Sequence, residues 1–231
     1  MVKPGLVGAY DKLFSHYGPQ RWWPTRQNTG LRRQERQQSA SGALSSDEQF
    51  EIIAGAILTQ NTSWKNAGKA INNLALGGVL SPDAIQRARE SELAEMIRPA
   101  GYYNQKAERL KLFARALANW RSEPTREALL SITGIGPETA DSILLYAYGR
   151  PCFVIDAYTR RLLSRLGIAR EDAPYEELQR LFHKEIPPAE KNIQAYKEFH
   201  ALIVRLCKDF CRKEPVCSGC PLGEICGFYK K

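Results

Sequence analysis

Four cysteines near the C-terminus constrain this chain more than any other feature of its sequence. They follow the spacing C-x5-C-x2-C-x5-C within sixteen residues, as Cys211, Cys217, Cys220 and Cys226. This is too close for four independent core cysteines, and four thiolates suit an iron–sulfur cluster or zinc. Structural zinc sites more often use two C-x2-C pairs, and here there is one. The pattern therefore favours a 4Fe–4S cluster, with zinc as the alternative metal and disulfides or free thiols as the remaining interpretations.

Size and charge narrow the class of protein. The 231 residues are 43% hydrophobic, which is enough for one large domain or two smaller lobes. A net charge of +8 fits a polyanionic partner such as nucleic acid, although a basic protein without such a partner has the same charge. No apolar run approaches the ~20 residues that cross a membrane, and the N-terminus lacks the apolar core of a signal peptide. We therefore expect a cytoplasmic protein, whose reducing surroundings disfavour disulfides.

The periodic segments indicate helices almost throughout, and no pair of strands is evident, so the predicted fold class is all-α. Ser45 and Glu48 match a capping box that opens one helix, and residues 104–120 form a long amphipathic pattern. Residues 25–46 are rich in Gln, Arg, Ser and Gly without apolar periodicity, which predicts a flexible loop. Three arginines of this loop are assigned to a solvated segment: Arg32, Arg33 and Arg36.

A glycine-rich turn, Gly134-Ile135-Gly136, separates two predicted helices, and Pro137 takes the first position of the second helix. Two glycines leave the backbone N–H groups of the turn unobstructed, and the helix N-terminus adds the positive end of its dipole. Such a turn can bind a phosphate without regard to base sequence. A plain corner between two helices, with Ile135 anchored in the core, is the alternative interpretation.

Asp156 follows a short extended segment and stands where the N-cap of the next helix belongs. Capping is a common role for aspartate at such a position. A fixed carboxylate has a second possible use, because cleavage of an N-glycosidic bond develops positive charge on the deoxyribose. One carboxylate can cap the helix and stabilise that charge, so both roles stay open for Asp156.

Several motifs together resemble the helix–hairpin–helix (HhH-GPD) DNA glycosylases of the endonuclease III superfamily, closest to the branch of endonuclease III-related 3-methyladenine glycosylases. They occur in the family's order over roughly residues 48–226. The motifs are L-x-x-x-G-I-G ending at Gly136, V-I-D ending at Asp156, C-P-L from Cys220, I-L-T-Q-N-T at 57–62 and G-Y-Y-N-Q-K-A at 101–107.

The resemblance implies a fold of two lobes. One is a helical barrel of residues 47–150 that carries the hairpin. The other joins residues 1–46 to residues 151–231 and carries the cluster loop at 206–226. The implied activity is excision of a damaged base from double-stranded DNA, with bending of the duplex and flipping of the base. We expect a monomer that associates with the nucleoid.

Individual roles follow from the resemblance in the same way. Asp156 is implied to be the catalytic aspartate, Gln60 to fill the hole left by the flipped base, and Tyr102 to wedge into the duplex. The hairpin is implied to hold the DNA backbone. Arg212 and Lys213 in the cluster loop are placed to face phosphates, while the cluster itself is inferred to be structural.

The chain departs from the family pattern at two positions. Where the bifunctional enzymes have a lysine that attacks the sugar, this chain has Glu138, which cannot form an imine. This predicts a monofunctional glycosylase, with a bifunctional enzyme for oxidised pyrimidines, using another lysine such as Lys106, as the alternative. The first cysteine spacing is five residues, where six are expected. Cys207 lies one helical turn earlier and is interpreted as a buried helix residue rather than a ligand.

Aromatic residues suggest which base is removed. Residues 21–24 and 59–64 look like segments of 3-methyladenine glycosylases in which an aromatic side chain from each sandwiches the base, and Trp22 and Trp64 occupy the matching positions. Trp23, beside Trp22, is included in the candidate base pocket. An alkylated purine carries delocalised positive charge, which indole faces attract. Packing in the core is the alternative for each tryptophan. Uracil or thymine opposite guanine is the main competing substrate, and a non-catalytic DNA-binding module is the competing class of protein.

Overall fold

The computed structural model describes residues 5–20, 22–23, 44–189 and 192–229. These residues form helices and loops with no strand among them, which confirms the all-α prediction. They divide into two compact units, here called the cysteine unit (Met1–Trp22 with Gly149–Lys231) and the hairpin unit (Trp23–Tyr148). Most of the predicted 25–46 loop, with its three arginines, lies outside the described residues. Among the helices described, none combines the length and the apolar character needed to span a bilayer.

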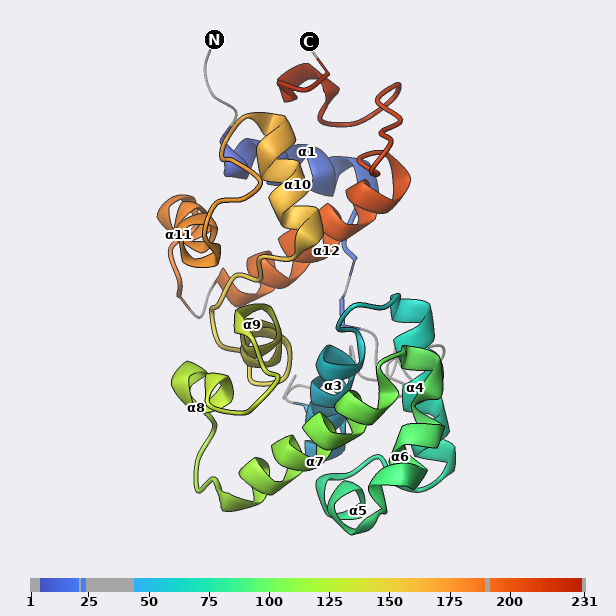
Figure 1. The fold of residues 1–231 in the computed structure, drawn as a ribbon. Helices are drawn as coiled ribbons and strands as arrows, with labels where there is room; N and C mark the ends of the chain where they lie inside the picture. The colour runs from blue at the N-terminus through green and yellow to red at the C-terminus, as the bar shows by residue number, and fades with distance from the viewer. Residues whose placement is uncertain (1–4, 21, 24–43, 190–191, 230–231) are drawn as a thin grey trace. The chain divides into compact units, whose positions relative to one another are not determined.

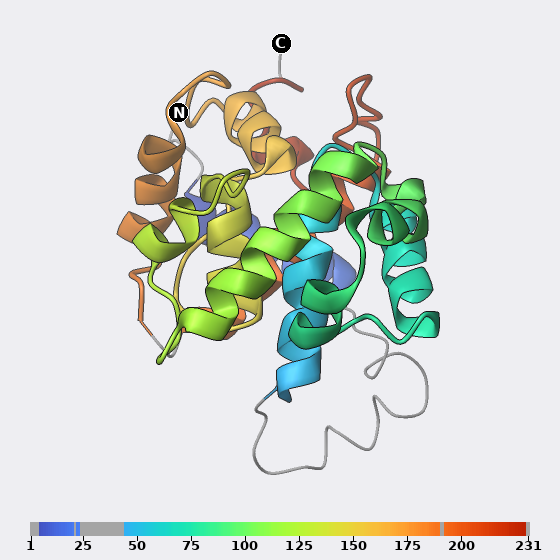
Figure 2. The same cartoon turned by 60° about the horizontal axis from the view of Figure 1, so that its bottom comes forward.

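Helix α3 (Ser46–Leu58) lies at the centre of the hairpin unit. The Glu48 N–H donates to Ser45 Oγ at 3.3 Å and the Ser45 N–H donates to Glu48 Oε2 at 2.9 Å, which confirms the predicted capping box. Three helices pack on α3 (Figure 1, Figure 2): α4 (Trp64–Leu76), α7 (Tyr103–Asn119) and α9 (Pro137–Tyr146). Shorter elements complete the unit: α5 (Pro82–Arg87), α6 (Glu90–Met96), η1 (Arg98–Ala100) and α8 (Arg126–Leu130).

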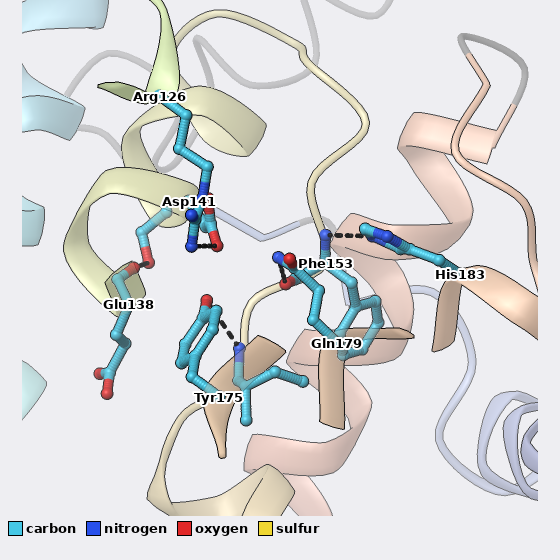
Figure 3. Close-up of polar contacts among 9 residues, drawn as sticks. Arg126, Glu138, Asp141, Phe153, Tyr175, Gln179 and His183 are labelled. Carbon is cyan, nitrogen blue, oxygen red and sulfur yellow. Dashed lines mark hydrogen bonds and ion pairs between the residues drawn. The ribbon is translucent and has the colours of Figure 1, made fainter. Parts of the chain in front are cut away.

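A partly buried ion pair joins the two helices of the hairpin, α8 and α9. Arg126 Nε lies 2.8 Å from Asp141 Oδ1, and Arg126 Nη2 donates to Asp141 Oδ2 at 3.2 Å (Figure 3). A bidentate arginine–carboxylate contact fixes orientation as well as distance. The turn between the helices is therefore held from both sides.

The cysteine unit is assembled on its long last helix. This helix, α12 (Ile193–Asp209), packs against α1 (Leu6–Tyr17) and α10 (Ala157–Leu166), and α11 (Tyr175–Glu185) packs against α1 (Figure 1). The apolar face of α12 is buried, and Phe153 stacks on Phe182 with ring centroids 3.7 Å apart. The cysteine loop follows α12 and ends with η3 (Gly223–Ile225).

The division between the units falls after Trp22, whereas the sequence interpretation placed it after residue 46. Trp23 explains the difference through its packing in the hairpin unit. Its ring lies 4.8 Å from that of Trp64 and 5.0 Å from that of Tyr146, measured between centroids. Gly55 makes room for it, because a Cβ there would lie 3.2 Å from the Trp23 ring.

Candidate active site

Asp156 caps helix α10, as its position after an extended segment predicted. Its Oδ1 accepts from the Thr159 N–H at 2.8 Å. Its Oδ2 lies 3.4 Å from His200 Nε2 on α12, an ion pair when the imidazole is protonated. The two side chains are only 13% and 8% exposed, so this carboxylate is held by partners on two helices in a mostly buried place.

The charge state of Asp156 follows from these contacts. Burial raises the pKa of Asp156, but the hydrogen bond and charge of His200 and the hydrogen bonds from Thr159 outweigh it, so the pKa lies below its ordinary value. The carboxylate is therefore ionised at neutral pH although little water reaches it. Sequence motifs did not reveal His200. The signal that could have indicated His200 is a polar residue on the apolar face of a predicted helix, because a buried polar side chain requires a partner.

Helix α11 holds the extended segment that leads to Asp156. The Tyr175 hydroxyl accepts from the Ile155 N–H at 3.3 Å, and Gln179 Nε2 donates to the Phe153 carbonyl at 2.8 Å (Figure 3). The Phe153 N–H donates to His183 Nε2 at 3.4 Å. Residues four apart share one face of a helix, so these three side chains form a row along the segment. The row fixes the backbone immediately before the carboxylate.

The two glycines of the hairpin are not equivalent. Gly134 has φ +85°, a conformation that favours glycine, and a Cβ there would lie 2.2 Å from Arg109 Nε, so the Arg109 side chain would have to move. Gly136 has an ordinary φ of −93°, and nothing lies within 4 Å of a Cβ built on it. Ile135 between them is buried. Gly134 is thus needed for the fold, whereas Gly136 leaves its backbone open to a ligand.

This difference gives a prediction for the pair of alanine variants. Gly134→Ala should destabilise the protein by about 1–2 kcal/mol, the cost of a left-handed conformation for an L-residue. Gly136→Ala should change stability by less than about 1 kcal/mol but weaken DNA binding, because its methyl group obstructs a phosphate at the turn. Thermal unfolding and fluorescence anisotropy with a duplex at fixed salt measure the two effects. Unchanged DNA affinity of Gly136→Ala would exclude the turn as a phosphate site.

Gln60 is bonded into the hairpin. Its Nε2 donates to the Gly134 carbonyl at 3.0 Å and to Thr139 Oγ1 at 2.8 Å. Its Oε1 accepts from Arg109 Nη1 at 2.5 Å. The sequence suggested no connection between this glutamine and the turn. The structure brings them together, so insertion of Gln60 into DNA requires that these bonds be exchanged.

Tyr102 stands at the start of α7 with its side chain 63% exposed. Its φ of 47° lies in the left-handed region, as does that of Asn61 at 52°. These are the two non-glycine residues with positive φ in the described part of the chain. Left-handed conformations cost energy for such residues and often mark functional segments.

Glu138 lies in the first turn of α9, where the bifunctional enzymes are implied to carry lysine. Its side chain is exposed, and its carboxylate points away from the Arg126–Asp141 pair (Figure 3). Its carbonyl accepts from Ser142 Oγ at 2.7 Å.

Lys106, the alternative nucleophile, is only 1% exposed. Burial, with a smaller contribution from the charge of Arg109, lowers the pKa of Lys106 to about 8. A lowered pKa suits an amine that acts as a nucleophile. However, Nζ donates to the Leu58 carbonyl at 2.9 Å and to the Ala100 carbonyl at 2.8 Å, so the amine is enclosed by backbone.

Two of the three tryptophans expected in the base pocket contact each other. Trp23 and Trp64 pack edge to face at 89°, and both are half-buried. Buried Tyr146 of α9 completes an aromatic group with them, a residue that the motifs did not indicate. Trp22 is half-buried and belongs to the cysteine unit.

The four loop cysteines line one pocket, together with apolar side chains such as Phe210, Val216 and Phe228. Gly219, at φ +77°, makes the turn between Cys217 and Cys220. Within the described ranges, no three His, Cys, Asp or Glu side chains stand close enough together to bind a single metal ion.

Arg165 of α10 organises this loop. Its guanidinium donates to Cys211 Sγ at 3.2 Å, to the Arg212 carbonyl at 2.7 Å and to the Lys213 carbonyl at 2.9 Å. A hydrogen bond from Cys207, reinforced by Arg165 and opposed by burial, lowers the pKa of Cys211 to about 6. Cys211 is thus poised as the thiolate that metals bind.

Cys207 itself does not line the pocket but is buried, with its Sγ 3.7 Å from the Tyr158 carbonyl oxygen. Arg212 and Lys213 lie in the cysteine loop, and both are exposed.

A helical fold with a Gly-Ile-Gly hairpin and a buried, ionised N-cap carboxylate has the features of a DNA glycosylase. Residues 54–188 match the profile of the HhH-GPD superfamily of base excision DNA repair proteins. Protein MJ1434 of Methanocaldococcus jannaschii, whose name provisionally assigns it as a DNA repair glycosylase, is 44% identical over 96% of this chain and 95% of its own length. This chain therefore belongs to the HhH-GPD superfamily.

Two solved structures have the same fold. H. pylori 3-methyladenine DNA glycosylase, bound to 1,N6-ethenoadenine, gives a TM-score of 0.71 at 32% identity, over 89% of this chain and 98% of that one. A trapped endonuclease III–DNA covalent intermediate gives 0.69 at 21% identity, over 85% and 91% of the two chains. The second similarity, at its lower identity, concerns the fold alone.

Proposed function

We propose that this protein is a monofunctional DNA N-glycosylase that removes alkylated purines, such as 3-methyladenine, from double-stranded DNA. The observation that carries the proposal is Asp156, a buried carboxylate that remains ionised. In such a place an anion stabilises the positive charge that develops on deoxyribose as the glycosidic bond breaks. Asp156 also orients an attacking water, and His200 keeps the carboxylate charged.

The aromatic residues supply the preference for alkylated bases. A methylated purine carries positive charge, and its attraction to an indole face contributes about 0.5–2 kcal/mol. Trp23 and Trp64 are half-buried neighbours, and Trp22 is adjacent in sequence. The 32% identity to the H. pylori 3-methyladenine glycosylase supports this substrate class.

The remaining contacts with DNA are assigned by position. The hairpin turn holds a backbone phosphate, Gln60 fills the space left by the flipped base, and exposed Tyr102 enters the duplex beside it. Arg212 and Lys213 add charge contacts from the cysteine loop.

The absence of a lyase lysine makes the proposed enzyme monofunctional. Endonuclease III has been trapped as a covalent intermediate with DNA. Here Glu138 takes the lysine position, and its carboxylate cannot form a Schiff base. Lys106 is enclosed, with its amine bonded to two carbonyls.

The cysteine loop is assigned a 4Fe–4S cluster rather than zinc. Structural zinc sites more often use two C-x2-C pairs, and this loop has one. All four thiols line the same pocket, as the ligands of one group must. Cys211, Cys217, Cys220 and Cys226 would hold the cluster, which when bound would cross-link the loop; its role in this proposal is structural.

Base release from a panel of duplexes tests the function. The panel contains 3-methyladenine, 7-methylguanine, hypoxanthine, uracil opposite guanine, and thymine glycol, with strands examined before and after alkali. We expect release of alkylated purines, strand breaks only after alkali, and no borohydride-trapped adduct. Trp64→Ala should slow release about 2- to 30-fold, from the cation–π contribution.

Trp120→Ala is the matched control, because Trp120 packs edge to face on Phe113 within the same unit but outside the aromatic group. Cleavage at thymine glycol without alkali, or a trapped adduct, would contradict the proposal and indicate a bifunctional enzyme. Release of uracil alone would indicate a mismatch glycosylase.

A further inference from the structure

We infer that Lys106 is a positioning residue for base flipping, because its buried ammonium holds the two backbone segments that carry Gln60 and Tyr102. The inference rests on the proposed function, in which these two side chains enter the duplex. Lys106 lies on α7 but bonds to the ends of two other elements. Leu58 is the last residue of α3, and Ala100 is the last residue of η1.

The two carbonyls are ones that a helix leaves without an internal donor. An ammonium is also favoured at a helix C-terminus, where the dipole is negative. These local gains explain why Lys106 is stable there. They do not explain why one side chain serves two separate segments, since either carbonyl alone can be satisfied by water or by a local donor.

The positions of the two segments supply the explanation. Gln60 lies two residues after Leu58, and Tyr102 lies two residues after Ala100. Each segment also holds one of the two non-glycine residues with positive φ among those described, Asn61 and Tyr102. Asparagine adopts this conformation readily, but at Tyr102 it is strained and persists only where the surroundings fix the backbone. One buried side chain fixes the backbone next to both.

Base flipping needs this coordination. One side chain must part the bases while the other takes the space of the extruded base, and both act at a single step of the duplex. A misplacement of about 1 Å can slow a reaction by about 10²-fold. A single ammonium at 2.9 and 2.8 Å from the two carbonyls sets the separation of the segments.

Helix α7 also carries a matched control. Lys111 Nζ donates to the carbonyls of Ile85 at 3.4 Å, Gln86 at 3.1 Å and Ala88, all at the end of α5. Like Lys106 it bonds helix-end carbonyls, but it holds one helix end rather than two, and that end carries none of the proposed DNA-contacting residues.

The test compares Lys106→Met with Lys111→Met in single-turnover base release. One substrate holds the alkylated purine in a paired duplex, and the other holds it opposite an abasic-site analogue, where flipping costs less. Lys106→Met should slow release from the paired duplex by about 10²-fold, the loss expected for misplaced groups. The loss should be much smaller opposite the abasic-site analogue, and 2-aminopurine fluorescence next to the lesion should show slower flipping. Lys111→Met should slow both substrates equally or neither.

Equal losses on the two substrates for Lys106→Met, or the same pattern in both variants, would overturn the inference. If Lys106→Met does not fold, Lys106→Gln keeps two N–H donors on a neutral side chain and is judged by the same ratio. Failure of the wild-type protein to release any base would contradict the proposed function instead, so the two failures are distinguishable.

Discussion

Asp156→Asn should lower base release by roughly 10²–10⁴-fold, the range for loss of a catalytic proton-transfer or charge-stabilising group. The variant should still bind lesion-containing DNA, because the hairpin and the cysteine loop are unchanged. Asparagine is as good an N-cap as aspartate, so α10 should remain intact. Single-turnover base release and equilibrium DNA binding, measured on the same preparation, separate the chemical step from recognition.

Asp156→Ala is the control for capping. It removes both the charge and the cap, so it should cost about 1 kcal/mol of stability in addition to activity. The pH dependence adds a second check. Since the folded-state pKa of Asp156 lies below 3.8, the ionised carboxylate contributes stability above that pH, which is lost as the pH falls through the folded value. Asp156→Asn should lack this acid-side loss. Full base release by Asp156→Asn would leave Asp156 with the capping role alone.

Cys217→Ser should abolish the brown colour and broad visible absorption that we expect of the wild-type protein. The wild type, purified without oxygen, should contain iron and acid-labile sulfide in equal amounts. Loss of one of four thiolates opens the cluster's coordination and should loosen the loop, because the bonds from Arg165 then act without the cross-link between the four cysteines. DNA affinity should fall with it, because Arg212 and Lys213 are then less firmly placed.

Cys207→Ala is the matched control, since Cys207 is buried one helical turn from Cys211 and does not line the pocket. It should retain iron, colour and DNA binding. A colourless wild-type protein that contains stoichiometric zinc would replace the cluster with a zinc site. Iron loss in Cys207→Ala equal to that in Cys217→Ser would make Cys207 a ligand.

Features that depend on neighbours in sequence were predictable. The Ser45–Glu48 capping box and the cap of α10 by Asp156 involve residues three positions apart. The hairpin turn was indicated by the sequence Gly134-Ile135-Gly136-Pro137, in which Gly134 has the left-handed conformation. The helices follow from apolar periodicity, because each must bury one face. Such local patterns can be recognised in the sequence without knowledge of the fold.

Contacts between distant residues could not be predicted in the same way. His200 lies on α12, and helices α10 and α11 separate it from Asp156 in the sequence. No spacing rule links the two residues. The motifs placed Lys106 in a turn sequence but did not show that its amine reaches Leu58. The sequence interpretation grouped Trp23 with the N-terminal segment, because its packing on Trp64 and Tyr146 cannot be seen in the sequence. Tertiary packing decided all three.

Helix α10 connects the cysteine loop to the Asp156 carboxylate that caps it. Asp156 stands before its first residue, and Arg165, one residue from its end, binds the carbonyls of Arg212 and Lys213. Ten residues of helix, about 15 Å long, act as a rigid rod between them. A change in the length of the loop would displace the carbonyls that Arg165 binds near the end of this helix. The five-residue first cysteine spacing and the arginines of α10 should therefore have changed together during divergence, whatever base the enzyme came to remove.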